Sequence, residues 1–199
     1  PVSLKGVILG VNDNQEVVSW ESIYMDRPMN PGETLYNEEY LYSSSGEAPE
    51  NVFVYFQATG YESASLSTYS VNTHNGDLEE TTYIYAPEAY YGRAYEYHYK
   101  EIKNIGKNEF ALEIYAIGRA ANGDIIDISE YYFAALAPGD TVLCAFYFDN
   151  TDLIETYEYV YYYDDDPWYH SCCQDLSCSY EIVSDGIEVT VTNNGEEDI

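Results

Sequence analysis

Apolar and polar residues alternate with a two-residue period along most of the chain, and helical periodicity is nearly absent. Residues 187–192 alternate apolar with polar side chains, and residues 95–100 alternate Tyr with Glu, His and Lys. Short strands of this kind, separated by turns, predict an all-β protein whose architecture is the two-sheet sandwich. The clearest case is residues 142–148, where one strand face carries Val142, Cys144, Phe146 and Phe148.

Two short segments have the composition of tight turns between strands. They are Asn75-Gly76-Asp77 and Asn122-Gly123-Asp124. Asn followed by Gly favours the backbone conformations with positive φ that two-residue hairpin loops need. We therefore expect each segment to connect two antiparallel strands.

The chain contains an internal repeat. Residues 14–22, a turn followed by a strand, align with residues 122–130 at an offset of 108 (122 − 14). Residues 29–35 align with residues 136–142 through a shared Pro-Gly turn, at an offset of 107 (138 − 31). Chance similarity between two β modules is the alternative interpretation, because Pro-Gly turns are common.

The two ends of the chain together resemble one internal stretch. Residues 192–199 followed by residues 1–10 resemble residues 103–118. We therefore expect the last segment to be the front of a module whose back half lies at the N-terminus. The chain is then one period of a longer tandem array, or a subunit that lends its tail to a neighbour.

This alignment divides the chain into four segments. Residues 1–57 form the C-terminal part of a first β-sandwich module, residues 58–165 a complete second module, residues 166–175 a linker, and residues 176–199 the N-terminal strands of the next copy of the first module. The first module is expected to be completed by a strand from a neighbouring or continuing chain, because an open sheet edge invites a further strand. The residues predicted at assembly contacts are Pro1, Val2, Leu4, Val189, Val191, Ile199, Tyr161, Tyr162, Tyr163 and Trp168.

The order of turns and strands carries a family resemblance. It is clearest from Asn104-Ile105-Gly106 through Asn122-Gly123-Asp124 and Ala137-Pro138-Gly139 to Phe146. This order resembles the FxLYD-type immunoglobulin-like modules of bacterial surface proteins, in two tandem copies over most of the chain. Tyr115-Ala116-Ile117 stands where the family has its aromatic-leucine-tyrosine-aspartate signature, and no Asp follows. The resemblance implies an exported, immunoglobulin-like β-sandwich that serves as a spacer, adhesive or assembly unit, with no active site to transfer.

The charge of the chain excludes several classes of partner. With 36 acidic and 7 basic side chains, the net charge is −29. Phosphate backbones and anionic membrane surfaces need a basic protein surface, so neither is an expected partner. No apolar run approaches the ~18 residues of a membrane span. Since 46% of residues are hydrophobic and 25 are Tyr, we expect an ordered protein with an acidic, tyrosine-rich exterior.

The four cysteines predict two disulfides in an exported chain. Cys172 and Cys173 are adjacent, so one is expected to bond Cys178 and the other Cys144, in an order that the sequence leaves open. A bridge between chains would cross-link a fibre. The rival is a zinc site formed by His170, Cys172, Cys173 and Cys178, although their spacing matches no usual zinc pattern.

A run of three carboxylates offers oxygen ligands for Ca²⁺. The residues are Asp164, Asp165 and Asp166, which lack the spaced loop of an EF-hand. A solvated acidic turn is the alternative, and no other cofactor is expected.

These patterns together predict a structural rather than an enzymatic role. The sequence has no Gly-x-Ser-x-Gly, His-Glu-x-x-His or phosphate-binding glycine loop. We expect the repeat unit of an extracellular filament or tandem-repeat surface fibre, which assembles head to tail through strand completion and Tyr-rich contacts. The alternative is a monomeric bacterial surface adhesin or lipoprotein module that binds carbohydrate or a host protein.

Overall fold

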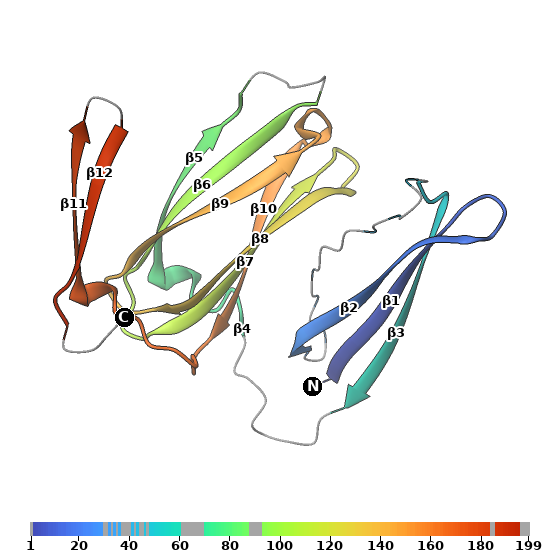
Figure 1. Cartoon of the computed structure of the whole chain (residues 1–199). Helices are drawn as coiled ribbons and strands as arrows, with labels where there is room; N and C mark the ends of the chain where they lie inside the picture. Colours follow the sequence, from blue (N-terminus) through green and yellow to red (C-terminus); the bar gives the residue numbers. More distant parts are fainter. Residues whose placement is uncertain are drawn as a thin grey trace. The chain divides into compact units, whose positions relative to one another are not determined.

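The computed structural model describes residues 2–29, 32, 34, 36, 41, 43, 46, 48–60, 70–87, 93–183 and 186–195. The chain divides into two compact units, Pro1–Ser67 (unit 1) and Thr68–Ile199 (unit 2). Strands dominate both (Figure 1). Within the described part of the chain, no helix has the length and apolar character needed to cross a bilayer.

Unit 1 contains one antiparallel sheet with the strand order β2-β1-β3. The central strand β1 (Val2–Val11) pairs with β2 (Val17–Met29) on one side and β3 (Asn51–Gly60) on the other. A tight turn joins β1 to β2, since the Asn12 N–H donates to the Glu16 carbonyl at 3.0 Å.

Unit 2 contains three antiparallel sheets, ordered β4-β10-β7-β8, β5-β6-β9 and β11-β12. Its elements are β4 (Ser70–Val71), the 3₁₀ turn η1 (Asn75–Asp77), β5 (Leu78–Tyr85), β6 (Tyr95–Asn104), β7 (Phe110–Arg119), β8 (Ile125–Leu136), β9 (Thr141–Asp149), η2 (Thr151–Leu153), β10 (Thr156–Asp164), η3 (Cys173–Asp175), β11 (Leu176–Val183) and β12 (Gly186–Asn193).

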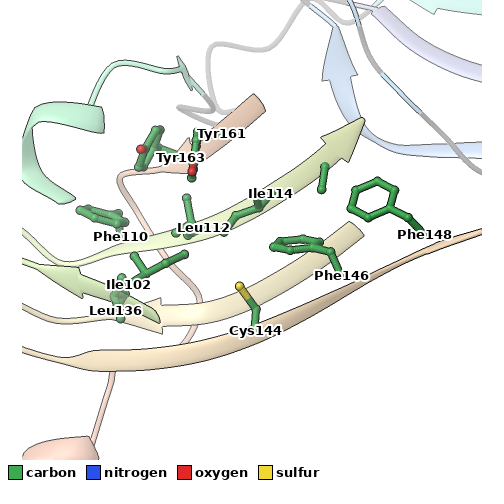
Figure 2. Packing of buried hydrophobic residues seen from close by; sticks show 11 residues of the cluster. Ile102, Phe110, Leu112, Ile114, Leu136, Cys144, Phe146, Phe148, Tyr161 and Tyr163 are labelled. Atoms are coloured by element: carbon green, nitrogen blue, oxygen red, sulfur yellow. The ribbon is translucent and has the colours of Figure 1, made fainter. Parts of the chain in front are cut away.

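The core of unit 2 lies between the β4-β10-β7-β8 and β5-β6-β9 sheets. Every second residue of the strands points into it, as the two-residue alternation requires. Figure 2 shows these side chains meeting between the layers. The predicted all-β sandwich architecture is therefore confirmed, whereas its immunoglobulin-like, tandem character stays a prediction. The buried cluster comprises Ile102, Phe110, Leu112, Ile114, Ala116, Leu136, Cys144, Phe146, Phe148, Tyr161 and Tyr163.

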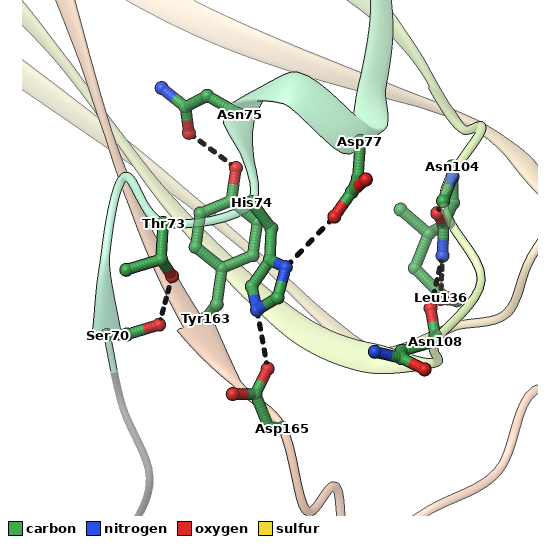
Figure 3. A network of polar contacts seen from close by, with 11 residues as sticks. Ser70, Thr73, His74, Asn75, Asp77, Asn104, Asn108, Leu136, Tyr163 and Asp165 are labelled. Carbon is green, nitrogen blue, oxygen red and sulfur yellow. Dashed lines mark hydrogen bonds and ion pairs between the residues drawn. The ribbon is translucent and has the colours of Figure 1, made fainter.

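Polar side chains hold one end of this sandwich together (Figure 3). The buried amide of Asn104 donates to the carbonyls of Leu136 at 2.8 Å and Asn108 at 2.9 Å. The ring of His74 lies between the carboxylates of Asp77, at 3.0 Å, and Asp165, at 2.9 Å. These contacts tie β6, β8 and the end of β10 to the chain that enters β5.

One of the two predicted hairpin turns is confirmed and the other is wrong. Asn122-Gly123-Asp124 joins β7 to β8, and Gly123 has the expected positive φ of 91°. Asn75-Gly76-Asp77 instead forms η1 ahead of β5. The physical reason is tertiary: the Asp77 N–H donates to the His74 carbonyl at 2.8 Å, and the Asp77 carbonyl accepts from the Ile105 N–H at 2.8 Å.

Candidate functional site

The sheet of unit 1 has the same pairing as half of the sandwich in unit 2. In β2-β1-β3, Val11 lies opposite Val17 and Asn51. In β8-β7-β10, Arg119 lies opposite Ile125 and Thr156. The central strands have their irregularities at matching places, since Gly10/Val11 in β1 corresponds to Gly118/Arg119 in β7 at an offset of 108 (119 − 11).

The turns of the two sheets match as well. The Gln15 N–H donates to the Asn12 carbonyl at 3.0 Å, and the Gly123 N–H donates to the Ala120 carbonyl at 2.9 Å. Gln15 has a φ of 63° where Gly123 has 91°. Gly32 and Gly139, in the two aligned Pro-Gly turns, have φ values of 83° and 93°.

The inward face of β3 is exposed where that of β10 is buried. By the shared register, Val52, Val54 and Phe56 correspond to Tyr157, Tyr159 and Tyr161. Tyr161 is 5% exposed within the sandwich core, and Tyr157 and Tyr159 pack against that core. Phe56 is 55% exposed, and Val52 and Val54 are exposed with it. Unit 1 is therefore a half-sandwich with an apolar face open on β3.

A second apolar surface lies on the β11–β12 hairpin. Leu176, Tyr180 and Ile182 of β11 are exposed, and so are Ile187, Val189 and Val191 of β12. The two strands pair with each other in a two-stranded sheet. Val189 and Val191, predicted as assembly contacts, are thus placed on a solvent-exposed face.

The other predicted contact residues are distributed as follows. Trp168 is 93% exposed, which suits a contact residue. The backbone of Val2 and Leu4 lies in β1, while their side chains, and the whole of Pro1 and Ile199, lie outside the described residues.

The three consecutive tyrosines of β10 are core residues, so their prediction as assembly contacts is wrong. Tyr161 and Tyr163 point between the sheets (Figure 2), and Tyr163 packs edge-on against Phe110 at 5.2 Å. Tyr162 points to the opposite face but is also fully buried, with its ring 5.6 Å from Tyr115. The sequence suggested surface rings because the run supplies aromatics to both faces, and both faces are in fact covered.

A cluster of tyrosines lies instead on the outer face of the β5-β6-β9 sheet, where Tyr85 and Tyr147 are exposed and Tyr95, Tyr97 and Tyr99 are half-buried. Tyr97 is at the centre, 5.2 Å from Tyr147 and 6.4 Å from Tyr85 between ring centroids. Tyr95 meets it edge-on at 6.1 Å, and Tyr99 stacks on it at 6.2 Å. We call Tyr85, Tyr95, Tyr97, Tyr99 and Tyr147 the tyrosine face.

The inner face of the same strand carries buried polar groups that the sequence analysis did not identify. His98 is bonded to the Tyr159 hydroxyl at 2.7 Å and to Glu96 at 3.1 Å. Lys100 forms an ion pair with Glu80 at 2.8 Å. The alternation in residues 95–100 was the available signal, because it puts His and Lys on one face and Tyr on the other.

All four cysteines lie within the described residues and are free thiols, so the predicted disulfides are not formed in this structure. Cys144 is 1% exposed and donates to the Lys100 carbonyl at 3.5 Å. Burial raises the pKa of Cys144 to about 12, so its thiol is unreactive at neutral pH. A linker thiol could reach it only if the sandwich opened, which corrects the predicted bridge to Cys144. Cys173 and Cys178 are exposed, and a bridge between chains through them stays a prediction.

The predicted metal ligands are engaged separately. The Asp164 carboxylate accepts from the Asp166 N–H at 3.1 Å, and Asp165 binds His74. Among the described residues, no three His, Cys, Asp or Glu side chains converge as a metal site would need. Calcium binding therefore stays a prediction without a preformed site to support it, and the zinc alternative has none either.

The linker is attached to the end of the sandwich through Glu109. This carboxylate accepts from the Ser171 N–H at 2.6 Å and lies 2.7 Å from His170. Burial opposes its ionisation, but these two partners outweigh burial and lower the pKa of Glu109. The attachment fixes where the chain enters η3 and the β11–β12 hairpin.

No protein-family model matches this chain, and a comparison with the curated proteins found no relative. The resemblance to immunoglobulin-like surface modules is therefore neither supported nor contradicted by relatives. Three surfaces are candidates for a function: the exposed face of β3, the exposed β11–β12 hairpin and the tyrosine face.

Proposed function

We propose that this chain is a structural repeat unit of an extracellular filament or tandem-repeat surface fibre, which joins head to tail by completing an open β module. The proposed work is mechanical and adhesive, not catalytic. The observation that carries the proposal is the half-sandwich: unit 1 repeats the register of β8-β7-β10 but exposes Val52, Val54 and Phe56, whose counterparts in unit 2 pack in a core.

The energetics favour covering this face. Fully burying one Val or Phe side chain contributes roughly 1.5–3 kcal/mol. Exposed apolar side chains scattered singly are normal, but three in a row on one strand face form a patch that marks an interaction site. A second sheet laid on β1–β3 would bury all three, and the association is therefore expected to be driven by apolar contact.

The strong negative charge is compatible with this role. A net charge of −29 keeps separate particles apart and soluble, while the apolar faces provide a directed contact. Screening by salt shortens the range of the repulsion but not that of the apolar contact. Assembly should therefore strengthen as ionic strength rises, the reverse of the behaviour of an assembly that depends on surface ion pairs.

The test is electron microscopy of the native material, combined with denaturing electrophoresis with and without reductant. Fibres with a regular axial repeat that give a band of 22.7 kDa when denatured and treated with reductant indicate separate subunits joined non-covalently or by disulfides. Fibres that stay very large when denatured and reduced indicate a covalent array. Discrete monomeric particles would contradict the proposal.

A second candidate function is a monomeric surface module that binds carbohydrate, and the tyrosine face supports it. Aromatic rings present apolar faces and polar edges, which suit stacking on sugar rings. Separately, β7 and β8 of the other sheet carry a depression of about 260 Å³ lined by Tyr131, Tyr132, Glu113 and Glu130, which places carboxylates beside aromatic rings. Retention of a monomer on a glycan array, lost with Tyr97→Ala, would favour this function over assembly.

A further inference from the structure

The β11–β12 hairpin is built like the β5–β6 pair of unit 2. Each follows a 3₁₀ turn that ends in Asp-Leu, at Asp77-Leu78 before β5 and Asp175-Leu176 before β11. The Asp77 N–H donates to the His74 carbonyl at 2.8 Å, and the Asp175 N–H donates to the Cys172 carbonyl at 3.0 Å. In both pairs the Leu lies opposite an Asn, Asn104 for Leu78 and Asn193 for Leu176.

The ends of the two strand pairs also make the same contacts. The Gly106 N–H donates to the Asn104 side chain at 2.9 Å, and the Gly195 N–H donates to the Asn193 side chain at 2.8 Å. The Asp77 carbonyl accepts from Ile105 at 2.8 Å, just as the Asp175 carbonyl accepts from Asn194 at 2.7 Å. In unit 2 this corner leads from β6 into β7, the central strand of the opposite sheet.

The equivalence assigns an inner face to the hairpin. Counting back from the two matching Asn residues, Ile187, Val189 and Val191 occupy the positions of His98, Lys100 and Ile102. The residues of β6 are 1%, 5% and 0% exposed inside the sandwich. Those of β12 are 63%, 61% and 60% exposed. In β6 this face is buried against β10. The equivalent face of β12 is exposed to solvent.

The chemistry of the two faces changes together. In unit 2 the polar residues of β6 meet tyrosines: His98 bonds Tyr159, and Lys100 lies 4.4 Å from the centre of the Tyr159 ring and 5.8 Å from that of Tyr161. At the matching positions β12 has only Ile and Val. β3 has Val54 and Phe56 in place of the two tyrosines.

Because both faces are apolar, packing β12 on β3 would leave no buried polar side chain without a partner. His98 or Lys100 laid against Val54 and Phe56 would lose the hydroxyl and ring partners that β10 supplies, which is costly in a core. Ile187 and Val189 against the same residues would make only apolar contacts. The face of β12 is thus matched to β3 by the same criterion that matches β6 to β10.

From this geometry we infer that the β11–β12 hairpin of one copy covers the β1–β3 sheet of a second copy, in the place that β5–β6 takes in unit 2. This inference rests on the proposed self-assembly and names its joint. Val189 packs on Val54 and Phe56, and Ile187 packs on Val52 and Val54. Val191 lies next along the strand, at the corner where Asn193 and Gly195 close the module.

Cysteine cross-linking between two differently labelled copies tests this joint. All four native cysteines are first removed (Cys144→Ala, Cys172→Ser, Cys173→Ser, Cys178→Ser), and sedimentation confirms that this background still behaves as the parent chain does. One copy then carries Val189→Cys and the other Val54→Cys. Because facing sheets lie about 10 Å apart, a short thiol-reactive cross-linker is used in place of direct oxidation.

The matched control moves the cysteine by one residue. Thr190→Cys lies on the opposite face of β12, so it has the same exposure to reagent but points away from the joint. We expect a dimer band from Val189→Cys mixed with Val54→Cys, and its loss with Thr190→Cys. Circular dichroism of each variant establishes that the strands have formed.

Three results would overturn the inference. Equal dimer yields from Val189→Cys and Thr190→Cys would show that contact between the hairpin and the second copy does not depend on the proposed face of β12. If a chain that carries both Val54→Cys and Val189→Cys cross-links only within itself at high dilution, the hairpin covers the β1–β3 sheet of its own chain and not that of a second copy. Fibres seen by electron microscopy, with no cross-linking in any mixture, would keep the proposed assembly but place its joint elsewhere.

Discussion

Lys100 shows what a charged residue needs in order to occupy a core position. It is 5% exposed, yet it has the Glu80 carboxylate at 2.8 Å and the Tyr159 ring at 4.4 Å. A buried cation without such partners would be expelled or neutralised. The residue is therefore tolerated because of its neighbours, and its counterpart Val189 needs none of them.

The first prediction concerns this ion pair. Lys100→Met should destabilise unit 2 by about 3 kcal/mol, the lower end of the range for breaking a buried pair, because Glu80 keeps 28% exposure and some access to water. The double variant Lys100→Met/Glu80→Leu should recover part of that loss, because apolar groups of similar volume replace both charges while the buried Tyr161 hydroxyl loses its bond to Glu80. Urea denaturation measures both.

The control for this prediction is Lys103→Met, which removes the same charge from an exposed position of the same strand and should change stability by less than about 0.5 kcal/mol. A double variant no more stable than Lys100→Met alone would contradict the account of the pair.

The second prediction is a loss of stability at alkaline pH. Burial raises the pKa of Cys144 from 9.0 to about 12 and that of Tyr159 from 10.0 to about 12. Both groups stay protonated longer in the folded chain than in the unfolded one. Their contribution is complete below pH 9 and is lost as the pH rises from 9 towards 12, so the free energy of unfolding should fall over that window.

Denaturation curves between pH 7 and pH 11 test this. Tyr159→Phe lowers stability at every pH by removing the bond to His98, but it should also flatten the slope above pH 10. Tyr180→Phe, which removes an exposed hydroxyl, should leave that slope unchanged. The same slope in the wild type and in Tyr159→Phe would refute the assignment.

At the scale of elements, the β1–β2 and β7–β8 turns solve one conformational problem with different residues. Gly123 has a φ of 91° and Gln15 a φ of 63° at corresponding positions. A side chain added at Gly123 would meet nothing within 4 Å, so the difference is one of backbone conformation and not of space. Glycine adopts this region without strain, whereas glutamine does not.

The third prediction exchanges these two residues. Gly123→Gln should destabilise unit 2 by about 1–2 kcal/mol, the usual penalty for a side chain in the left-handed region. Gln15→Gly should stabilise unit 1 by a smaller amount, because glycine also makes the unfolded chain more flexible. Chemical denaturation of the two single variants measures the pair, and unchanged stability in Gly123→Gln would show that the turn is not strained.

The sequence predicts the strands well because their alternation is local. Val142, Cys144, Phe146 and Phe148 lie on the inner face of β9, as expected, and the Asn122 turn and the Pro-Gly turns carry their own signals. It predicts less well which face of a mixed strand is inside. In residues 95–100 the polar His98 and Lys100 are buried and the tyrosines are only half-buried, because only the folded chain brings Glu80 and Tyr159 alongside.

The same limit explains the remaining errors. Tyr161, Tyr162 and Tyr163 supply rings to both faces of β10, and sequence alone does not say that both faces are covered. Asn75-Gly76-Asp77 has hairpin chemistry but is held as a 3₁₀ turn by its bond to Ile105, which lies in a distant segment. Such contacts are set by tertiary structure and leave no local pattern.

At the scale of the whole molecule, the described residues form a complete sandwich in unit 2, an open sheet in unit 1 with the register of half that sandwich, and a hairpin with an exposed apolar face. The packing seen in this sandwich shows how the sheet of unit 1 and the β11–β12 hairpin are each expected to be covered. Its β5–β6 pair covers the β8-β7-β10 sheet, and β11–β12 has the same turn, register and corner as β5–β6. The acidic surface opposes indiscriminate contact between copies, so the proposed association would depend on matched faces.

Sedimentation velocity of the full chain over a range of concentrations, at physiological ionic strength, shows directly whether copies of it assemble through the face of the hairpin. The account predicts wild-type species that grow with concentration well beyond 22.7 kDa. It predicts that Val189→Asp sediments as a monomer, because a charge on the hairpin's inner face cannot be buried, and that Thr190→Asp assembles as the wild type does. A wild-type chain that stays monomeric at every concentration would contradict it.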